Sequence, residues 1–180
     1  AILDHFPEKR QTLLFSATVP PEIRRMIDKH LENPEELLLS GDNISPDAVT
    51  HYYYISSHMR KADTLIKILQ VEEPDSALIF CNTREDAAFV GNFLKNRGYD
   101  AETISGALNQ TQRERVMKRI KSGGLHLLAA TDIAARGIDI NRLSHVINWA
   151  LPESPEVYVH RTGRTGRAGL TGTAISIVSG

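Results

Sequence analysis

The sequence predicts an α/β fold in which helices cover both faces of a parallel sheet. Short runs of β-branched and aliphatic residues alternate along the chain with amphipathic stretches, and this alternation is typical of βαβ units. The 180 residues, 41% hydrophobic and 24% charged, have the composition of an ordinary globular protein. Because 21 Lys and Arg are matched by 22 Asp and Glu, a nucleic-acid partner would need a local basic patch.

Seven short apolar runs are expected to form strands, and helices are expected to fill the gaps between them. The expected strands are Thr12–Ser16, Val49–Ile55, Ala77–Cys81, Ala101–Ile104, His126–Ala130, Val146–Trp149 and Gly172–Val178. The one cysteine, Cys81, lies inside an apolar run. We expect it to be a reduced core residue of an intracellular protein.

Three helix starts are marked by capping residues. Thr83 and Asn109 are each followed three residues later by a residue that can complete a cap, and Ser154 is followed by a proline that suits a first helical turn. The first of these helices should end at Gly98, and the second at the Gly pair 123–124.

A domain boundary is expected between residues 31 and 49, where two prolines and a Gly-Asp-Asn cluster interrupt the periodicity. We therefore divide the chain into 1–35, a linker over 36–48, and a main domain over 49–180. No apolar run approaches the roughly 18 residues of a membrane span. The chain also lacks a secretory signal pattern at its start, so we expect a cytoplasmic protein without a membrane partner.

Two segments carry residues suited to phosphate chemistry. Residues 130–140 (ATDIAARGIDI) follow a predicted strand, where ligands of parallel α/β sheets gather; a polar loop closing a short helix is the alternative. Residues 160–169 (HRTGRTGRAG) alternate arginines with glycines. Arginine offers a planar fork of donors to phosphate oxygens, and glycine allows positive φ or a close backbone approach. This run predicts a phosphate clamp, with a solvated basic turn as the alternative.

Several enzyme classes have no motif in the sequence. The pattern GxxxxGK[ST] does not occur, so no phosphate-binding P-loop is present to hold a triphosphate and its Mg²⁺. The histidines and the cysteine lack zinc spacing, and neither GxSxG nor HExxH occurs. These 180 residues are therefore not expected to form a complete ATPase.

The chain resembles the C-terminal RecA-like lobe of DEAD-box RNA helicases, preceded by the end of their N-terminal lobe. The family's motifs are matched in order by residues 15–18 (FSAT), 78–84 (LIFCNTR), 110–113 (QTQR), 130–140 and 158–169. The resemblance implies a P-loop NTPase-type helicase fold and makes residues 1–35 a remnant of the other lobe, including a helix from Pro21 to Leu31. We expect the chain to be a piece of a longer protein and its first 35 residues to be weakly anchored.

The resemblance also implies roles for individual residues. Arg164 and Arg167 match the catalytic arginine fingers that reach the triphosphate when the two lobes close. ATP, with Mg²⁺ held mainly by the N-terminal lobe, would contact Gly137, Asp139, Arg164 and Arg167. RNA would contact Thr83, Arg84, Gly106, Arg113 and Thr131 through its backbone, without regard to sequence. Positions matching those that couple the lobes are Ser16, Thr18, Gln110, Asp132, Arg136, His160 and Arg161.

The resemblance has one departure and leaves alternatives open. Relatives usually have His-Gly-Asp where this chain has Ser105-Gly106-Ala107, so only the backbone of Gly106 is expected to bind phosphate there. The expected partners are RNA and the protein's own N-terminal lobe, and the fragment alone should be inactive. The alternatives are a DNA-directed superfamily 2 helicase lobe and a non-catalytic RNA-binding module.

Overall fold

The computed structural model describes residues 7, 10–16, 19, 21–37, 48–106, 108–135, 143–166 and 169–180. The chain divides into two compact units, Ala1–Asp42 and Asn43–Gly180. Some of the predicted positions lie outside the described residues: Thr18, Ala107, Arg136, Gly137, Asp139, Arg167 and most of the 36–48 linker.

The first unit contains the helix α1 (Pro21–His30), which agrees with the helix expected from the resemblance. The strand predicted at Thr12–Ser16 is wrong, because these residues have no regular secondary structure and Phe15 is 89% exposed. A strand exists only where a neighbouring strand bonds its backbone N–H and C=O groups. No described residue of this unit supplies such a neighbour.

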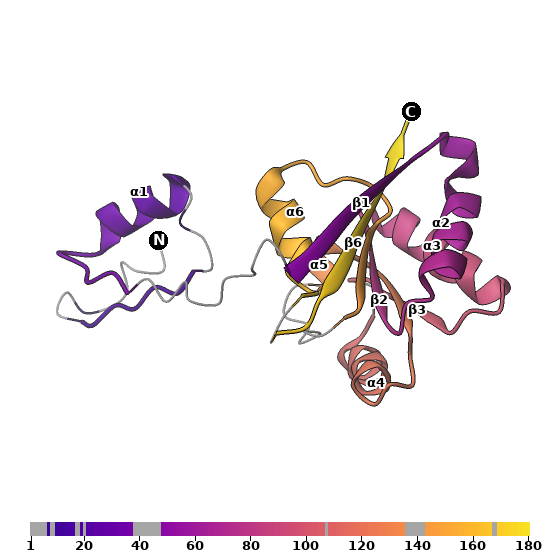
Figure 1. Ribbon diagram of the computed structural model, residues 1–180. Helices are drawn as coiled ribbons and strands as arrows, with labels where there is room; N and C mark the ends of the chain where they lie inside the picture. The colour runs from indigo at the N-terminus through magenta and orange to yellow at the C-terminus, as the bar shows by residue number, and fades with distance from the viewer. Residues whose placement is uncertain are drawn as a thin grey trace. The chain divides into compact units, whose positions relative to one another are not determined.

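The second unit is built on a six-stranded sheet in the order β1-β6-β5-β2-β4-β3, and every strand pair is parallel (Figure 1). Six of the seven predicted strands are confirmed, with β4 and β5 each displaced by one residue. The strands are β1 (Val49–Ser56), β2 (Ala77–Cys81), β3 (Ala101–Ile104), β4 (Leu127–Thr131), β5 (His145–Asn148) and β6 (Gly172–Ser179).

The helices begin where the capping residues predict. The Thr83 hydroxyl accepts a hydrogen bond from the Asp86 amide at 3.0 Å, and Asn109 and Gln112 form a reciprocal capping box. Ser154 caps the last helix, and Gly98 and Gly123 follow their helices with positive φ. The helices are α2 (Lys61–Glu72), α3 (Arg84–Asn96), α4 (Gln110–Lys121), α5 (Asp132–Ala135) and α6 (Pro155–Thr162), with a 3₁₀ turn η3 (His58–Arg60) before α2. None of the described helices is long and apolar enough to cross a membrane.

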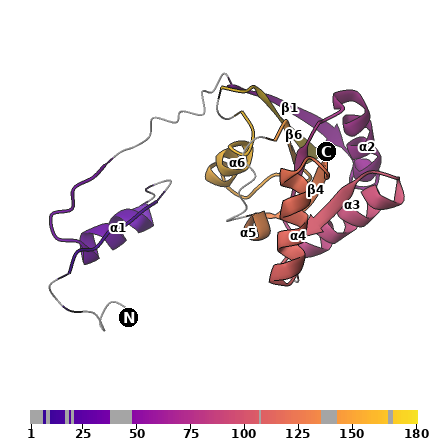
Figure 2. The same ribbon diagram turned by 90° about the horizontal axis from the view of Figure 1, so that it is seen from below.

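Two hydrophobic cores lie on opposite faces of the sheet. Alternate residues of the central strand β2 enter different cores, so that Ile79 packs with α2 and α3 while Leu78 packs with α4 and α5. Figure 2 shows α2 and α3 on one side of the sheet and α5 and α6 on the other. Because both faces are covered, all five residues of β2 are buried.

The order of the strands determines where the polar residues meet. The chain crosses the sheet from β1 through β2 to β3, and then returns through β4 and β5 to β6. The carboxyl ends of β2, β4 and β5, which are neighbours in the sheet, therefore lie at one edge. In such sheets this is the edge where ligands bind.

Candidate functional site

The guanidinium group of Arg161 is the centre of the strand-end site. It is 1% exposed, and Nε and Nη2 donate to the two carboxylate oxygens of Asp132 at 2.8 and 2.7 Å. Nη2 also donates to Asn82 Oδ1 at 2.9 Å, and Nη1 donates to Asn148 Oδ1 at 3.1 Å and to the Ala150 carbonyl at 2.8 Å. Arginine has five N–H donors, so every one of them has an acceptor.

Such complete pairing is what makes a buried guanidinium tolerable. An unpaired charge in the interior would cost several kcal/mol, whereas a bidentate bond to a carboxylate returns much of that energy. The guanidinium carbon also lies 5.0 Å from the ring centroid of Phe80, which adds a cation–π contact. Arg161 thus fastens α6 to the ends of β2, β4 and β5, and it brings together two predicted coupling positions, Arg161 and Asp132.

Two members of this site, Asn82 and Asn148, were not predicted from the sequence. Asn148 is fully buried at the end of β5, between Ile147 and Trp149, and a polar side chain between apolar neighbours was the signal that could have identified it. Asn82 follows the end of β2 directly, and its amide also donates to the Leu151 carbonyl at 2.9 Å.

The turn after α6 carries Arg164, one of the two predicted fingers. Its amide donates to the Arg161 carbonyl at 3.1 Å. The next residue, Thr165, is fully buried, and its hydroxyl donates to the carbonyls of Leu143 and Ser144. Arg164 therefore lies between two buried residues, of which Arg161 is bonded at the carboxyl ends of the strands and Thr165 is bonded to the segment before β5. These bonds fix the backbone from which the Arg164 side chain extends.

The two described glycines of this turn, Gly163 and Gly166, differ in their backbone conformation and surroundings. Gly166 has a φ of +65°, and a Cβ there would stand 2.5 Å from Val49 Cγ2 and 3.1 Å from the Ala48 carbonyl oxygen. The positive φ was anticipated, but the close neighbour is the start of β1 and not a ligand. Gly163 has an ordinary φ of −64° and forms the C-cap of α6.

Three of the predicted RNA positions lie together. Thr83 caps α3, and Arg84 is its first residue. The Arg84 guanidinium lies beside Gly106, with Nη2 3.4 Å from where a Cβ of that glycine would stand. These residues follow β2 and β3.

The other two predicted RNA positions meet at α5. Arg113, on α4, donates from Nη2 to the Ala134 carbonyl at 3.0 Å. Thr131 ends β4, and its hydroxyl accepts the Ala134 amide at 3.4 Å. The segment after β4 does contain a short helix, as the alternative interpretation held, but Asp132 at its start also belongs to the Arg161 site.

Two predicted coupling positions of the second unit, Gln110 and His160, are not among the described hydrogen-bonding partners of Arg161. Gln110 donates to Glu114 Oε1 at 2.8 Å within its own helix. His160 is exposed beside Arg161, and Ser16 is part of the first unit.

Two ionisable groups behind the site are perturbed by burial. Burial raises the pKa of the Cys81 thiol to about 12. Burial also lowers the pKa of Lys61, an effect that the nearby Asp86 carboxylate opposes. The Lys61 ammonium lies 5.1 Å from the ring centroid of Trp149, and Trp149 packs in the hydrophobic core that contains Ile79.

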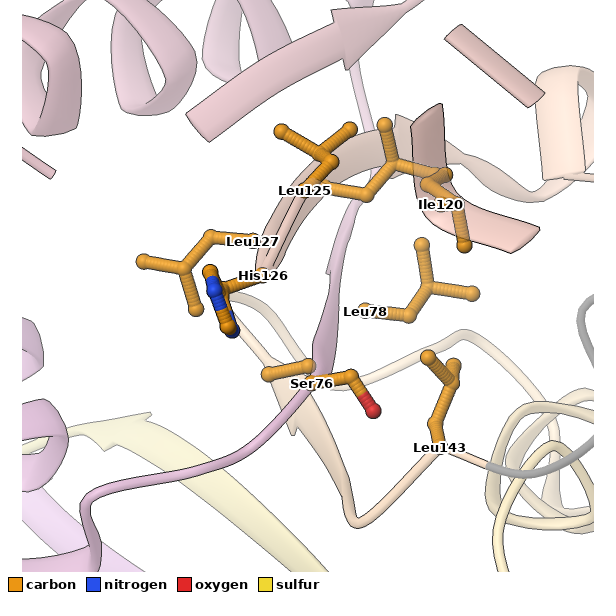
Figure 3. A pocket seen from close by; sticks show the side chains of 9 residues that line it. Ser76, Leu78, Ile120, Leu125, His126, Leu127 and Leu143 are labelled. Atoms are coloured by element: carbon orange, nitrogen blue, oxygen red, sulfur yellow. The ribbon is translucent and has the colours of Figure 1, made fainter. Parts of the chain in front are cut away.

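The described part of the chain has no cluster of three or more His, Cys, Asp or Glu placed to hold a metal ion. Figure 3 shows a cavity near the amino ends of β2 and β4, at the opposite edge of the sheet. The cavity has a volume of about 10 Å³. This volume suits about one water molecule.

Comparison with known proteins places this arrangement in a family. Residues 60–169 match the helicase conserved C-terminal domain. The chain is 42% identical over 179 residues to the DEAD-box ATP-dependent RNA helicase CshA of Geobacillus kaustophilus, and 38% identical to CshA of Bacillus subtilis. The match covers 99% of this chain but 38% and 36% of those relatives, so the chain spans little more than a third of their length.

Solved structures agree with this assignment. A variant of Dbp5 from S. cerevisiae, bound to RNA and ADP BeF3, has a TM-score of 0.85 and 32% identity over 99% of this chain and 48% of that chain. The E. coli DEAD-box protein SrmB, bound to regulator of ribonuclease activity A, has a TM-score of 0.69 and 38% identity over 73% and 78%. The chain belongs to the helicase conserved C-terminal domain family, and its second unit is the RecA-like C-terminal lobe of a DEAD-box protein.

Proposed function

We propose that this chain is the second motor lobe of an ATP-dependent RNA helicase that unwinds or remodels RNA duplexes. In this role it supplies arginine fingers to ATP hydrolysis and part of the surface that binds the RNA backbone. The observation that carries the proposal is the buried Arg161 site, which fastens α6 to the carboxyl ends of β2, β4 and β5 and thereby supports the turn after α6 that bears Arg164. The RNA helicases among the relatives support the choice of substrate.

The chemistry assigned to this lobe is electrostatic. ATP and Mg²⁺ would be held mainly by the N-terminal lobe, and Arg164 and Arg167 would approach the phosphates when the lobes close, with Gly137 and Asp139 at the nucleoside. A finger neutralises charge that develops on the transferring phosphoryl group, which is worth roughly 10³ to 10⁵ in rate. The anchors at Arg161 and Thr165 would hold the Arg164 backbone in place before ATP arrives, so that little reorganisation is needed.

RNA would bind across the strand ends. Arg84 supplies positive charge beside Gly106, and Arg113 supplies it beside α5. The Gly106 backbone would approach a phosphate closely. Contacts of this kind bind the sugar-phosphate backbone and carry no sequence information. Binding should therefore weaken as salt is raised, because counterions are released from the RNA.

The proposal is tested in a two-lobed protein in which a DEAD-box N-terminal lobe precedes these residues. ATP hydrolysis is measured without nucleic acid, with single-stranded RNA and with single-stranded DNA, at saturating ATP. We expect RNA but not DNA to stimulate hydrolysis. Arg164→Ala and Arg167→Ala should each abolish the stimulation while RNA binding persists, and the 180-residue chain alone should bind RNA weakly and hydrolyse no ATP.

Three results would contradict the proposal in different ways. Stimulation by DNA would favour a DNA-directed superfamily 2 lobe. Hydrolysis that both arginine variants retain would remove the finger assignment. A two-lobed protein that binds RNA but never hydrolyses ATP would favour a non-catalytic RNA-binding module.

A further inference from the structure

Asn148 and Ser176 are two buried polar residues that face each other across neighbouring strands. Asn148 is 0% exposed on β5, Ser176 is 4% exposed on β6, and the two are paired in register. The Asn148 amide donates from Nδ2 to Ser176 Oγ at 3.1 Å. We call these residues the Asn148–Ser176 pair.

The chemistry of Arg161 fixes the direction of these hydrogen bonds. A guanidinium can only donate, so the Asn148 group 3.1 Å from Arg161 Nη1 must be the carbonyl oxygen. The Asn148 NH₂ group must then point at Ser176 and donate to it. Because Ser176 accepts this bond, its own hydroxyl proton is available for another acceptor.

A group on α6 can accept it. The Ser176 hydroxyl lowers the pKa of the Tyr158 phenol against the larger, opposite effect of burial, and the phenol oxygen lies 2.8 Å from His51 Nδ1 on β1. Tyr158 and Arg161 are three residues apart on α6, so both point from the same side of the helix. The Asn148–Ser176 pair thus contacts α6 at two points of the face that lies against the sheet.

We infer that the Asn148–Ser176 pair is a positioning element for the arginine finger, because it sets the rotation and height of α6 on the sheet. The turn carrying Arg164 follows α6 directly, and its amide is bonded to Arg161. A small rotation of α6 would therefore move Arg164 away from the phosphate, and misplacement by about 1 Å can cost on the order of 100-fold in rate. This inference rests on the proposed function.

The experiment measures RNA-stimulated ATP hydrolysis in the two-lobed protein carrying Asn148→Leu, Asn148→Asp or Ser176→Ala. Asn148→Leu keeps the approximate volume but removes both hydrogen bonds. Asn148→Asp keeps an acceptor for Arg161, whereas Ser176→Ala removes both the acceptor of the Asn148 amide and the link toward Tyr158. Ser179→Ala, on the exposed end of the same strand, is the matched control.

We expect Asn148→Leu to lower kcat by at least about tenfold while KM for ATP and the Kd for RNA stay within about twofold, because the finger acts in the transition state. Asn148→Asp should recover much of the loss, Ser176→Ala should cost about threefold, and Ser179→Ala should cost nothing. If Asn148→Leu does not fold, the inference is still tested by comparing the kcat of Ser176→Ala with the kcat of Ser179→Ala. Equal activity of these two serine variants, or a raised KM with an unchanged kcat, would overturn the inference.

A double-mutant cycle separates the inference from the proposed function. If the pair acts through the finger, Asn148→Leu should cost less than about twofold once Arg164 is already alanine, since coupled residues are not additive. Full additivity would overturn the positioning role while leaving the finger intact. An Arg164→Ala variant with unchanged kcat would instead overturn the finger assignment, and the positioning role would then be overturned as well.

Discussion

At the scale of single residues, two arginines that look alike in the sequence have different surroundings. The run 160–169 was interpreted as a clamp in which the arginines share one role, but Arg161 is 1% exposed and bound to the sheet. Arg161 lies in α6 and faces the sheet, whereas Arg164 follows the end of the helix. The resemblance separates their roles, coupling for Arg161 and finger for Arg164, but the alternation of arginine and glycine alone does not, because Asp132, Asn82 and Asn148 come together with Arg161 only when the sheet forms.

Cys81 provides a prediction at this scale. Burial raises the pKa of its thiol to about 12, well above the ordinary value of 9.0, so the thiol stays neutral in the folded chain. We expect iodoacetamide to alkylate Cys81 very slowly at pH 9 in the folded chain and rapidly in the urea-unfolded chain, because only the thiolate reacts.

The same shift predicts how stability depends on pH. Below pH 9 the thiol is protonated in both states, so it contributes no pH dependence. Above pH 9 the unfolded thiol ionises while the folded one does not, so the free energy of unfolding should fall as pH rises from 9 toward 12. A Cys81→Ala chain should lose less stability over this range. Fast alkylation of the folded chain, or identical pH profiles, would contradict the account.

At the scale of the elements, local capping chemistry was sufficient to predict the starts of three helices. Thr83, Asn109 and Ser154 all cap as expected, because a cap depends on residues within one turn. The strand at Thr12–Ser16 failed for the opposite reason. Its apolar sequence suits a strand, but a strand also needs a partner that no local pattern specifies.

Gly166 provides a prediction at the scale of elements, because it joins the finger turn to β1. Gly166→Ala would combine strain at positive φ with a 2.5 Å contact to Val49, so we expect a loss of about 2–4 kcal/mol in the free energy of unfolding. Gly98→Ala is the matched control, since Gly98 has a φ of +84° but a Cβ there would have nothing within 4 Å. This variant should lose only about 1 kcal/mol in the free energy of unfolding. Urea unfolding, followed by the fluorescence of Trp149, the one tryptophan, measures the free energy of unfolding of both variants. Equal losses in the two variants would contradict the packing argument.

At the scale of the whole molecule, the alternation of strands and helices predicted the parallel α/β sheet, and six strands were confirmed. The gathering of polar residues at strand ends was also predictable, since parallel strands share one carboxyl edge. The strand order was not inferred from the pattern, although it makes β2, β4 and β5 neighbours and so creates the Arg161 site. That site depends on contacts between residues up to 79 positions apart. The hydrophobic periodicity of the sequence describes only neighbouring residues and so does not predict such contacts.

The central claim is that Arg164 acts on the phosphates only when a second lobe presents ATP. The most direct test is single-turnover hydrolysis of ATP already bound to the RNA complex of the two-lobed protein, with ATP affinity measured separately. We expect Arg164→Ala to slow this step by roughly 10³-fold or more while ATP affinity changes much less. A single-turnover rate that Arg164→Ala leaves unchanged would contradict the account.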